Sequence, residues 1–278
     1  MTRPAEKKDI QRLANLIHFE TRVHRHLDWR APLDWIGYQP FFLTELGTQV
    51  LAALACPPDP PGIAWIRLFV VGSDFDPSQA WNILWPAAQK ALFQTSCRTI
   101  VAISLQDWFR QLLLGSGFQL VNHVILLEWE RATISPRIIS PAINIRSLKI
   151  QDMPVLEVLD RSAFGPIWHN SSESLEFAFR QAAIATVAEL DGEIVGYQIS
   201  TTTQMGGHLA RLAIRPDFQR LGIGSALLQD LLIEFVRKGA LRITVNTQQD
   251  NKASISIYEK AGFVRTGESY PVYQFNLQ

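Results

Sequence analysis

The stretch Leu209–Ser225, LARLAIRPDFQRLGIGS, decides the fold of this chain. Its first part, Leu209–Arg215, has the apolar pattern of a strand, and Pro216 ends that strand because proline has no amide hydrogen to donate. From Gly224 onward, apolar side chains recur every three to four positions, as on one face of a helix. The stretch therefore predicts a strand, a glycine-bearing loop and a helix.

The predicted helix carries signals at both ends. Its apolar face is formed by two rows of side chains: Leu227, Leu231 and Phe235, and Leu228, Leu232 and Val236. Gly239 stands where a helix commonly ends. At the start, free backbone N–H groups and the helix dipole favour an anion, and Gly222 and Gly224 let a ligand approach the backbone closely. The loop therefore suits a diphosphate, with Arg220 adding positive charge at the rim.

Two other kinds of diphosphate site do not fit this loop. The chain has no G-x-x-x-x-G-K-[ST] pattern, which excludes a nucleotide P-loop. A dinucleotide site needs a third glycine and a downstream acidic residue, and neither stands at the required spacing. For a G-x-G pattern taken alone, a simple tight turn remains the alternative.

A second motif follows the first at a suitable separation. The segments RPDFQRLGIGSALL (215–228) and NTQQDNKASISIYEKAGF (246–263) resemble two characteristic blocks of the GCN5-related N-acetyltransferase (GNAT) superfamily. The resemblance covers nearly all of residues 143–278 and is closest to the branch of ribosomal-protein alanine acetyltransferases. In the second block the matching positions are Asn251, Ser254, Tyr258, Gly262 and Phe263.

The resemblance implies acetyl-CoA as co-substrate and assigns roles to residues. The backbone of Leu212, Ala213 and Ile214 is expected to pair with the pantetheine arm. The diphosphate is expected to be held by the loop and first helical turn: Gln219, Arg220, Leu221, Gly222, Ile223, Gly224 and Ser225. Asn251 and Ser254 are expected near the pantetheine end. Tyr258 is expected to be the general acid that protonates the departing thiolate, since a tyrosine is protonated at neutral pH.

The general base departs from the family pattern. The alanine acetyltransferase branch commonly has a glutamate five residues before the asparagine, and here Asn246 stands there. An amide cannot accept a proton at neutral pH, so Asn246 is expected to act through a water that it holds. Arg211 stands where many relatives carry an acid. The other candidate bases are His208, Glu189 and Glu268.

The acceptor side of the site is expected in two regions. The first holds Phe164, Trp168, His169, Asn170 and Ser171, and the second holds Glu268, Tyr270 and Tyr273. Aromatic and polar groups of this kind suit an amine on a small molecule or a peptide N-terminus. For any one of these residues, ordinary packing or a solvated surface remains the alternative.

A faint internal repeat runs through the chain. Four blocks of the first half correspond to blocks of the second half, 143 to 145 positions later: Arg3–Asp9 with Arg146–Asp152, Phe42–Ala55 with Thr186–Ile199, Ile66–Val71 with Ala210–Arg215, and Leu112–Phe118 with Ile257–Phe263. A near-constant offset across four separate blocks indicates that the chain contains two copies of one domain. Each copy is predicted as an α/β (α+β layered) domain, a mixed, mostly antiparallel sheet flanked by helices.

The expected division is a degenerate GNAT-like domain in residues 1–131, a linker in 132–142 and a catalytic GNAT domain in 143–278. In the first copy, the segment DFDPSQAWNILWPAAQKAL (74–92) replaces the glycine loop, and Leu113 stands at the position of Tyr258. We therefore expect the first copy not to bind acetyl-CoA by the usual loop. His24 and His26 lack a partner cluster, so no metal site is expected.

Composition limits the remaining possibilities. The 26 basic and 26 acidic residues balance, so no long-range field favours nucleic acid or an anionic membrane. No signal-peptide pattern or membrane-spanning apolar stretch is found, and the two cysteines, Cys56 and Cys97, have no metal-type or redox-type neighbours. These features predict a cytoplasmic protein with buried, reduced thiols. The oligomeric state stays open, with a homodimer as one option.

The leading hypothesis is an N-acetyltransferase that acts on a primary amine by direct attack in a ternary complex. No cysteine lies in either motif, which disfavours a covalent acyl-enzyme. Two alternatives remain, a non-catalytic acyl-CoA-binding or sensing protein and a transferase of a longer acyl group. The sequence leaves the identity of the amine open, because a fold does not determine a substrate.

Overall fold

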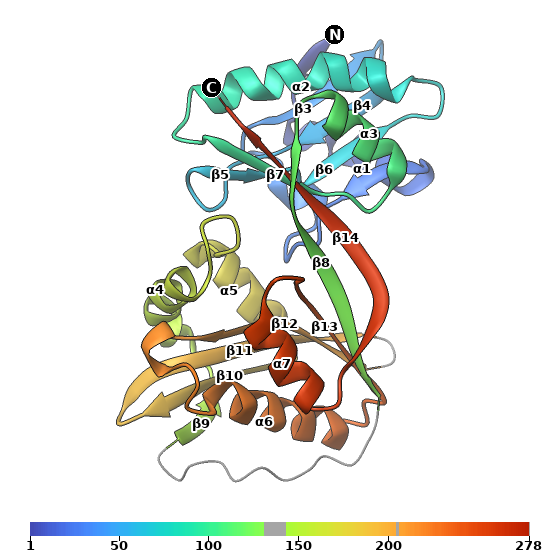
Figure 1. The fold of residues 1–278 in the computed structure, drawn as a ribbon. Helices are drawn as coiled ribbons and strands as arrows, with labels where there is room; N and C mark the ends of the chain where they lie inside the picture. The colour runs from blue at the N-terminus through green and yellow to red at the C-terminus, as the bar shows by residue number, and fades with distance from the viewer. Residues whose placement is uncertain (131–142, 204–205, 278) are drawn as a thin grey trace. The chain divides into compact units, whose positions relative to one another are not determined.

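The computed structural model describes residues 1–130, 143–203 and 206–277, so the predicted linker 132–142 lies outside the described residues. The chain forms two compact units (Figure 1). One consists of Met1–Val121 with Tyr270–Gln278, and the other of Asn122–Ser269. Both combine helices with mostly antiparallel strands, which confirms the predicted α/β layered class.

The first unit contains a five-stranded sheet in the order β1-β3-β4-β6-β2. Its strands are β1 (Thr2–Pro4), β2 (Arg22–Arg25), β3 (Phe41–Leu46), β4 (Gln49–Ala55) and β6 (Leu68–Val71). A further group has the order β5-β7-β14, formed by β5 (Ile63–Trp65), β7 (Thr99–Ile103) and the end of β14 (Val264–Asn276). The helices are α1 (Ile10–Phe19), α2 (Pro77–Phe93) and α3 (Asp107–Gly115), with short 3-10 turns at Lys7–Asp9 and Pro32–Trp35.

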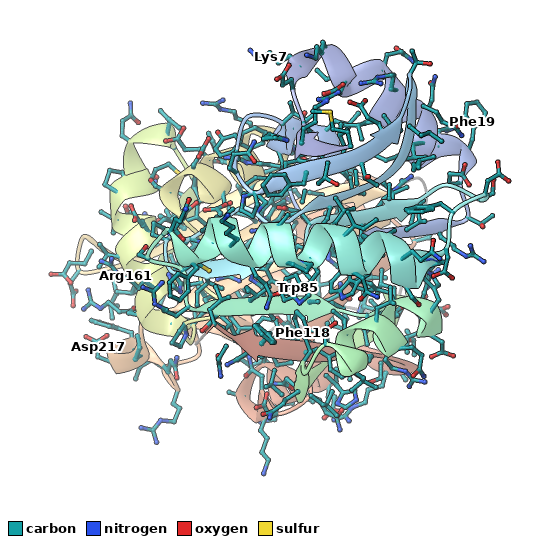
Figure 2. The ribbon with its side chains drawn as sticks, turned by 90° about the horizontal axis from the view of Figure 1, so that it is seen from above. Lys7, Phe19, Trp85, Phe118, Arg161 and Asp217 are labelled. Atoms are coloured by element: carbon teal, nitrogen blue, oxygen red, sulfur yellow. The ribbon has the colours of Figure 1, made fainter. Side chains whose placement is uncertain are left out.

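The core of the first unit is rich in aromatic side chains. Trp81 and Trp85 project from α2 and stack with ring centroids 5.2 Å apart. Trp85 also approaches Phe118, at 5.3 Å between centroids (Figure 2). Fully burying large aromatic side chains of this kind contributes about 1.5–3 kcal/mol each, so this cluster is a main source of stability for the unit.

The second unit is built on strands in the order β9-β10-β11-β12-β13-β8-β14. The strands not yet bounded are β8 (Gln119–Glu130), β9 (Ile143–Ser147), β10 (Ile184–Leu190), β11 (Glu193–Thr203), β12 (Gly206–Ile214) and β13 (Arg242–Gln248). One face packs against α6 (Ile223–Arg237) and α7 (Lys252–Lys260). The other face is covered by α4 (Met153–Ala163) and α5 (Ser172–Gln181), and 3-10 turns occur at Ile150–Asp152 and Pro216–Phe218.

Two long strands, β8 and β14, each pair with a strand from the other half of the sequence. In the second unit, Val124–Glu130 of β8 pairs antiparallel with β13. In the first unit, Val272–Asn276 of β14 pairs antiparallel with β7. Each unit therefore contains a strand from outside the range that the sequence indicated, 1–131 or 143–278. Strand pairing is a long-range choice between backbone edges, and neither spacing nor composition reveals it.

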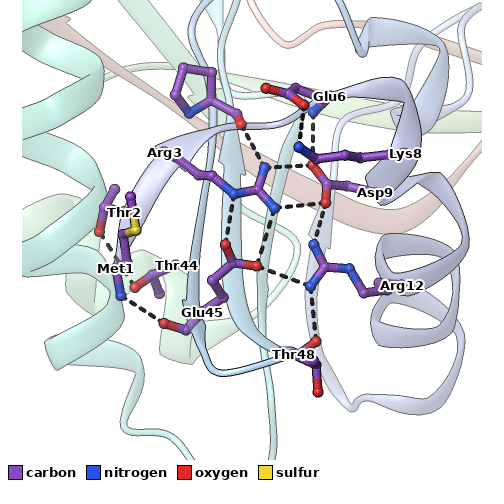
Figure 3. Close-up of polar contacts among 11 residues, drawn as sticks. Met1, Thr2, Arg3, Glu6, Lys8, Asp9, Arg12, Thr44, Glu45 and Thr48 are labelled. Atoms are coloured by element: carbon purple, nitrogen blue, oxygen red, sulfur yellow. Dashed lines mark hydrogen bonds and ion pairs between the residues drawn. The ribbon is translucent and has the colours of Figure 1, made fainter.

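The repeat seen in the sequence has a structural counterpart at the start of each unit. Arg3 donates from Nε to Glu45 at 2.7 Å and from Nη1 to Asp9 at 2.7 Å (Figure 3). The hydrogen bond from Arg3 holds the pKa of the Asp9 carboxyl well below its usual range. The second unit has the same network, with both bonds from the arginine again 2.7 Å long, among Arg146, Asp152 and Glu189.

Two features were sought in the described ranges 1–130, 143–203 and 206–277: a membrane-spanning helix and a cluster of metal-ligand side chains. No helix in these ranges is long and apolar enough to cross a bilayer. No group of three or more histidine, cysteine or acidic side chains in the same ranges is placed to hold a metal ion. Cys56 and Cys97 are free and buried, and burial raises the pKa of both thiols. Neither thiol is therefore suited to act as a nucleophile.

The first unit is expected to lose stability in mild acid because of His24. This side chain is 3% exposed, and burial lowers its pKa from 6.5 to about 4. A buried neutral histidine stabilises fully above the unfolded pKa of 6.5, and the contribution is lost as the pH falls towards 4. Protonation of His24 is expected to contribute about 2 kcal/mol to the loss between pH 7 and pH 5, and the neighbouring His26, whose pKa is also lowered by burial, adds to it. The loss is measured by urea unfolding followed by tryptophan fluorescence.

The control for this prediction is His24→Phe, which keeps an aromatic ring beside Phe109 and removes the titration. The variant is expected to have a smaller dependence of unfolding free energy on pH over the same range. An equal dependence in both proteins would contradict the assignment to His24.

Candidate active site

The sheet of the second unit opens between its two parallel strands. β12 and β13 pair only from Gly206–Arg242 to Leu209–Val245. Both strands continue beyond this point, β12 to Ile214 and β13 to Gln248. β12 keeps its pairing with β11 as far as Ile214, with a register shift at Ile199/Ser200. A β-bulge bends a strand away from its neighbour, so the backbone of β12 beyond the shift presents one edge to the opening.

The predicted pantetheine-binding residues lie along this edge. Leu212 and Ile214 pack towards α6, where they join Ile223 and Leu227. Ala213 is buried on the opposite face. Their backbone groups on the β13 side lie beyond the last pair of the ladder, so they are available to an extended ligand lying in the opening.

The glycine loop brings backbone donors to the end of this opening. Arg220 and Gly222 both have positive φ, 66° and 85°, so the loop turns sharply before α6. The first bond of the helix runs from Ala226 N to Gly222 O at 3.0 Å. The amides of Ile223, Gly224 and Ser225 precede it and have no acceptor within the helix. Unpaired amides at a helix start, together with the helix dipole, favour negative charge at this end of the opening.

Gly224 also allows a close approach between helices. A Cβ at this position would lie 3.2 Å from Cδ1 of Ile257 on α7. The remaining loop residues, Gln219–Gly222, are exposed, and the Gln219 side chain donates to Ile214 O at 3.3 Å. The loop is therefore tied to the end of β12, and its outer face is open to solvent.

Tyr258 lies on α7 and is 4% exposed. Its ring packs against Phe263, with centroids 5.7 Å apart. Burial raises the pKa of its hydroxyl, while the nearby Ser254 side chain and the charge of Arg211 lower it. The net result is a pKa above the usual 10, so the hydroxyl carries its proton at neutral pH and can act as a donor.

Asn246 and Asn251 have different surroundings. Asn246 is half-buried on β13, one residue beyond the last pair with β12, and it pairs with Leu126 of β8. It therefore borders the opening. Asn251 caps α7, because its Oδ1 accepts from Ser254 N at 3.1 Å. This capping role was missed by sequence reasoning, although an asparagine three residues before a serine at a helix start indicates it.

A buried cluster joins the acceptor-side loop to the sheet. Arg211 donates to both oxygens of Asp160 at 2.7 Å, and Asp160 is fully buried. Tyr197 donates its hydroxyl proton to the same carboxylate, and burial followed by the charge of Asp160 raises the pKa of Tyr197 well above 10. Asp160 also accepts from Asn170 N at 2.7 Å. The Asp160 carboxylate accepts hydrogen bonds from Arg211, Tyr197 and Asn170, so it joins α4 to the sheet and to the loop after α4.

Arg211 also contacts two of the predicted acceptor residues. Its Nη2 donates to Trp168 O at 2.9 Å, and its guanidinium lies 3.5 Å from the centroid of the Phe164 ring. His169 lies in the same loop, and its Nδ1 is buried without a hydrogen-bond partner in the described structure. Sequence reasoning noted Arg211 as a departure from the family, but it missed Asp160 and Tyr197.

The structure separates the candidate bases. Glu189 is held by Arg146 at 2.7 Å, in the network that is repeated in the first unit. Glu268 is exposed on β14. Tyr270, which was predicted beside Glu268 on the acceptor side, belongs to the first unit. His208 is on β12, one residue before the end of the ladder, and its Nδ1 lies 2.8 Å from Thr244 Oγ1. Burial lowers the pKa of His208, so the ring is neutral at pH 7.

The second unit therefore combines an open strand edge with unpaired amides at the start of α6. Residues 153–263 match the model of the Acetyltransferase (GNAT) family. The match lies within the second unit. This confirms the resemblance found in the sequence.

Individual relatives resemble the chain in part or in whole. The [ribosomal protein bS18]-alanine N-acetyltransferase of Escherichia coli K12 is 28% identical over 122 residues, which cover 43% of this chain and 80% of that protein. A GCN5-related N-acetyltransferase from Sphaerobacter thermophilus has a TM-score of 0.66 at 16% identity, covering 100% of this chain and 96% of its own. A tandem GNAT protein from the clavulanic acid biosynthesis pathway has a TM-score of 0.68 at 14% identity, covering 100% and 98%. The two structures share the fold.

Proposed function

We propose that the second unit transfers an acetyl group from acetyl-CoA to a primary amine by direct attack in a ternary complex. The observation that carries this proposal is the open edge of β12, which leads to the unpaired amides at the start of α6. Backbone donors and acceptors along Leu212–Ile214 suit the amide groups of a pantetheine arm. The loop Gln219–Gly222 and the first turn of α6 suit its diphosphate.

In the proposed reaction, the amine nitrogen forms a bond to the thioester carbonyl carbon and the carbon–sulfur bond breaks. The departing thiolate takes the proton of the Tyr258 hydroxyl, which solvent later restores. The attacking nitrogen loses one proton to a water at Asn246 or to the neutral ring of His208. Holding amine and thioester together supplies much of the rate, because a bimolecular encounter becomes an intramolecular step.

The class of amine that accepts the acetyl group is proposed from the loop Phe164–Ser171 and from one relative. The loop presents aromatic rings and polar groups and is fixed to the sheet through Arg211. The Escherichia coli relative is named as an N-acetyltransferase for alanine of ribosomal protein bS18. We therefore place a peptide N-terminus first and a small-molecule amine second.

The proposal is tested by incubating the full chain with acetyl-CoA and a panel of peptides and small amines. Release of free CoA that depends on an amine, with a mass gain of one acetyl group on that amine, is the expected result. Binding of acetyl-CoA without release across the panel would instead support a non-catalytic acyl-CoA-binding protein. Release that occurs only with a longer acyl-CoA would support a transferase of a longer acyl group.

Gly222→Asp is expected to weaken acetyl-CoA binding by at least about tenfold. The substitution places a negative charge where the diphosphate is proposed to lie, and a loss of 1.4 kcal/mol already corresponds to a factor of about ten. Binding is measured by isothermal titration with the full chain. The matched control is Gly239→Asp, because Gly239 ends the same helix with φ of 84° and has the same open surroundings. An equal loss in both variants would point to strain alone.

A further inference from the structure

The first unit contains a counterpart of the open strand edge. With the repeat offset, Leu212–Ile214 correspond to Leu68–Val70 of β6. β6 pairs with β4 on one side, from Ala52–Val71 to Ala55–Leu68, as β12 pairs with β11. The other edge of β6 corresponds to the edge of β12 along which the pantetheine arm is proposed to bind.

That edge is taken by the chain itself. β2 pairs antiparallel with β6, from Arg22–Val71 to Arg25–Leu68. The pairing extends one residue further, because His26 N donates to Arg67 O at 3.0 Å. In the second unit the corresponding stretch, 165–168, forms a turn rather than a strand, with Trp168 N bonded to Gly165 O at 2.9 Å. The same part of the repeat therefore fills the edge in one unit and leaves it free in the other.

Side chains anchor β2 in this position. His24 stacks on Phe109 of α3, with ring centroids 4.0 Å apart and an interplanar angle of 19°. Its Nε2 lies 3.1 Å from Ile66 O, within hydrogen-bond distance. Arg25 donates to Ile17 O at 2.8 Å. β2 is thus attached through both its backbone and its side chains, as an integral part of the unit.

The helix start that would bind a diphosphate is also occupied. α2 of the first unit corresponds to α6 of the second, and Asp76 caps it, with its carboxylate accepting from Gln79 N at 2.9 Å. The first helical residue is Pro77, which has no amide hydrogen. A carboxylate of the chain therefore stands at the helix end where the second unit offers free amides to an anion.

We propose that the first unit is a self-occupied form of the acyl-CoA fold, in which β2 takes the place of the pantetheine arm and Asp76 that of the diphosphate. The chain accordingly binds one acyl-CoA, in the second unit, and the first unit is stable without one. Only the statement about the single binding site rests on the proposed function. The occupation of the β6 edge stands on the structure of the first unit alone.

Hydrogen–deuterium exchange and isothermal titration of the full chain test the proposal. Without ligand, slow exchange in both Arg22–Arg25 and Leu68–Val71 is expected, and rapid exchange of β2 would overturn the self-occupied edge. With acetyl-CoA, one molecule per chain is expected, with new protection at Leu212–Ile214 and none at Leu68–Val71. Two molecules per chain, or protection by acetyl-CoA at Leu68–Val71, would overturn the inference.

The Gly222→Asp variant separates this inference from the proposed function. If the variant still binds acetyl-CoA through the first unit, protection will appear at Leu68–Val71 and the inference fails. If the unaltered chain binds no acetyl-CoA, the proposed function fails, and the exchange of β2 without ligand still decides whether the edge is occupied. Loss of binding in the variant, with β2 slow to exchange, supports both.

Discussion

Ending the chain after Ser269 is expected to unfold the first unit, although the deleted residues are far from residues 1–121 in the sequence. The deletion removes the stretch of β14 that pairs with β7, from Val272–Ile103 to Asn276–Thr99. It also removes Tyr273, which is 5% exposed in the core of the first unit, and Phe275, which lies 5.4 Å from Trp85.

The size of the effect follows from these contacts. Two aromatic side chains contribute about 1.5–3 kcal/mol each, to which the lost strand adds several hydrogen bonds. This sum approaches the 5–15 kcal/mol of net stability that is typical of a whole domain. Limited proteolysis and hydrogen exchange are expected to show loss of protection throughout residues 1–121.

Two point variants refine this prediction. Tyr273→Ala is expected to destabilise by about 3–5 kcal/mol, as large-to-small changes at buried aromatic residues do. Gln274→Ala, at the half-buried neighbouring position, is expected to change stability by less than about 0.5 kcal/mol. If the truncated chain keeps full exchange protection in residues 1–121, β14 is not needed to complete the first unit.

Tyr258→Phe is expected to lower kcat by about 10²–10⁴-fold, the range that general acid catalysis supplies. The substitution removes one hydroxyl and keeps the buried ring against Phe263. KM for acetyl-CoA is expected to change little, because the proposed contacts to the cofactor come from β12 and the loop before α6. The initial rate of CoA release, measured with a saturating amine, checks both parameters.

The matched control is Tyr273→Phe. Tyr273 is buried to a similar degree, 5% exposed against 4% for Tyr258, and lies in the core of the first unit. This variant is expected to keep its rate within about twofold. An unchanged rate in Tyr258→Phe, with acetyl-CoA still bound, would remove the tyrosine from the mechanism and leave protonation of the thiolate to solvent.

Features set by neighbours in the sequence were predictable. Pro216 and Gly239 indicated the end of β12 and the end of α6, and the structure places both elements within a residue or two of those points. An Asp-Gly pair between alternating apolar residues favours a tight hairpin turn, and Asp191-Gly192 joins β10 to β11 with φ angles of 51° and 82°. In each case a backbone preference of one or two residues determines the geometry.

Features set by distant residues were not predictable from one sequence. Nothing near Arg22–Arg25 indicates that it pairs with β6 while its counterpart in the second copy forms a turn. The cluster of Asp160, Tyr197 and Arg211 joins three separate elements, and each residue alone reads as ordinary surface or core. Such contacts depend on which strand edges and cavities the whole fold leaves open, so a local sequence pattern does not predict them.

The exchange of strands β8 and β14 has a consequence for synthesis on the ribosome. The first unit receives a strand, Val272–Asn276, from residues that are translated after the whole second unit, so the edge of β7 stays unpaired while that unit emerges. An unpaired edge is a template for association with other chains. Slower synthesis of the second unit lengthens the time for which this edge is open to such association.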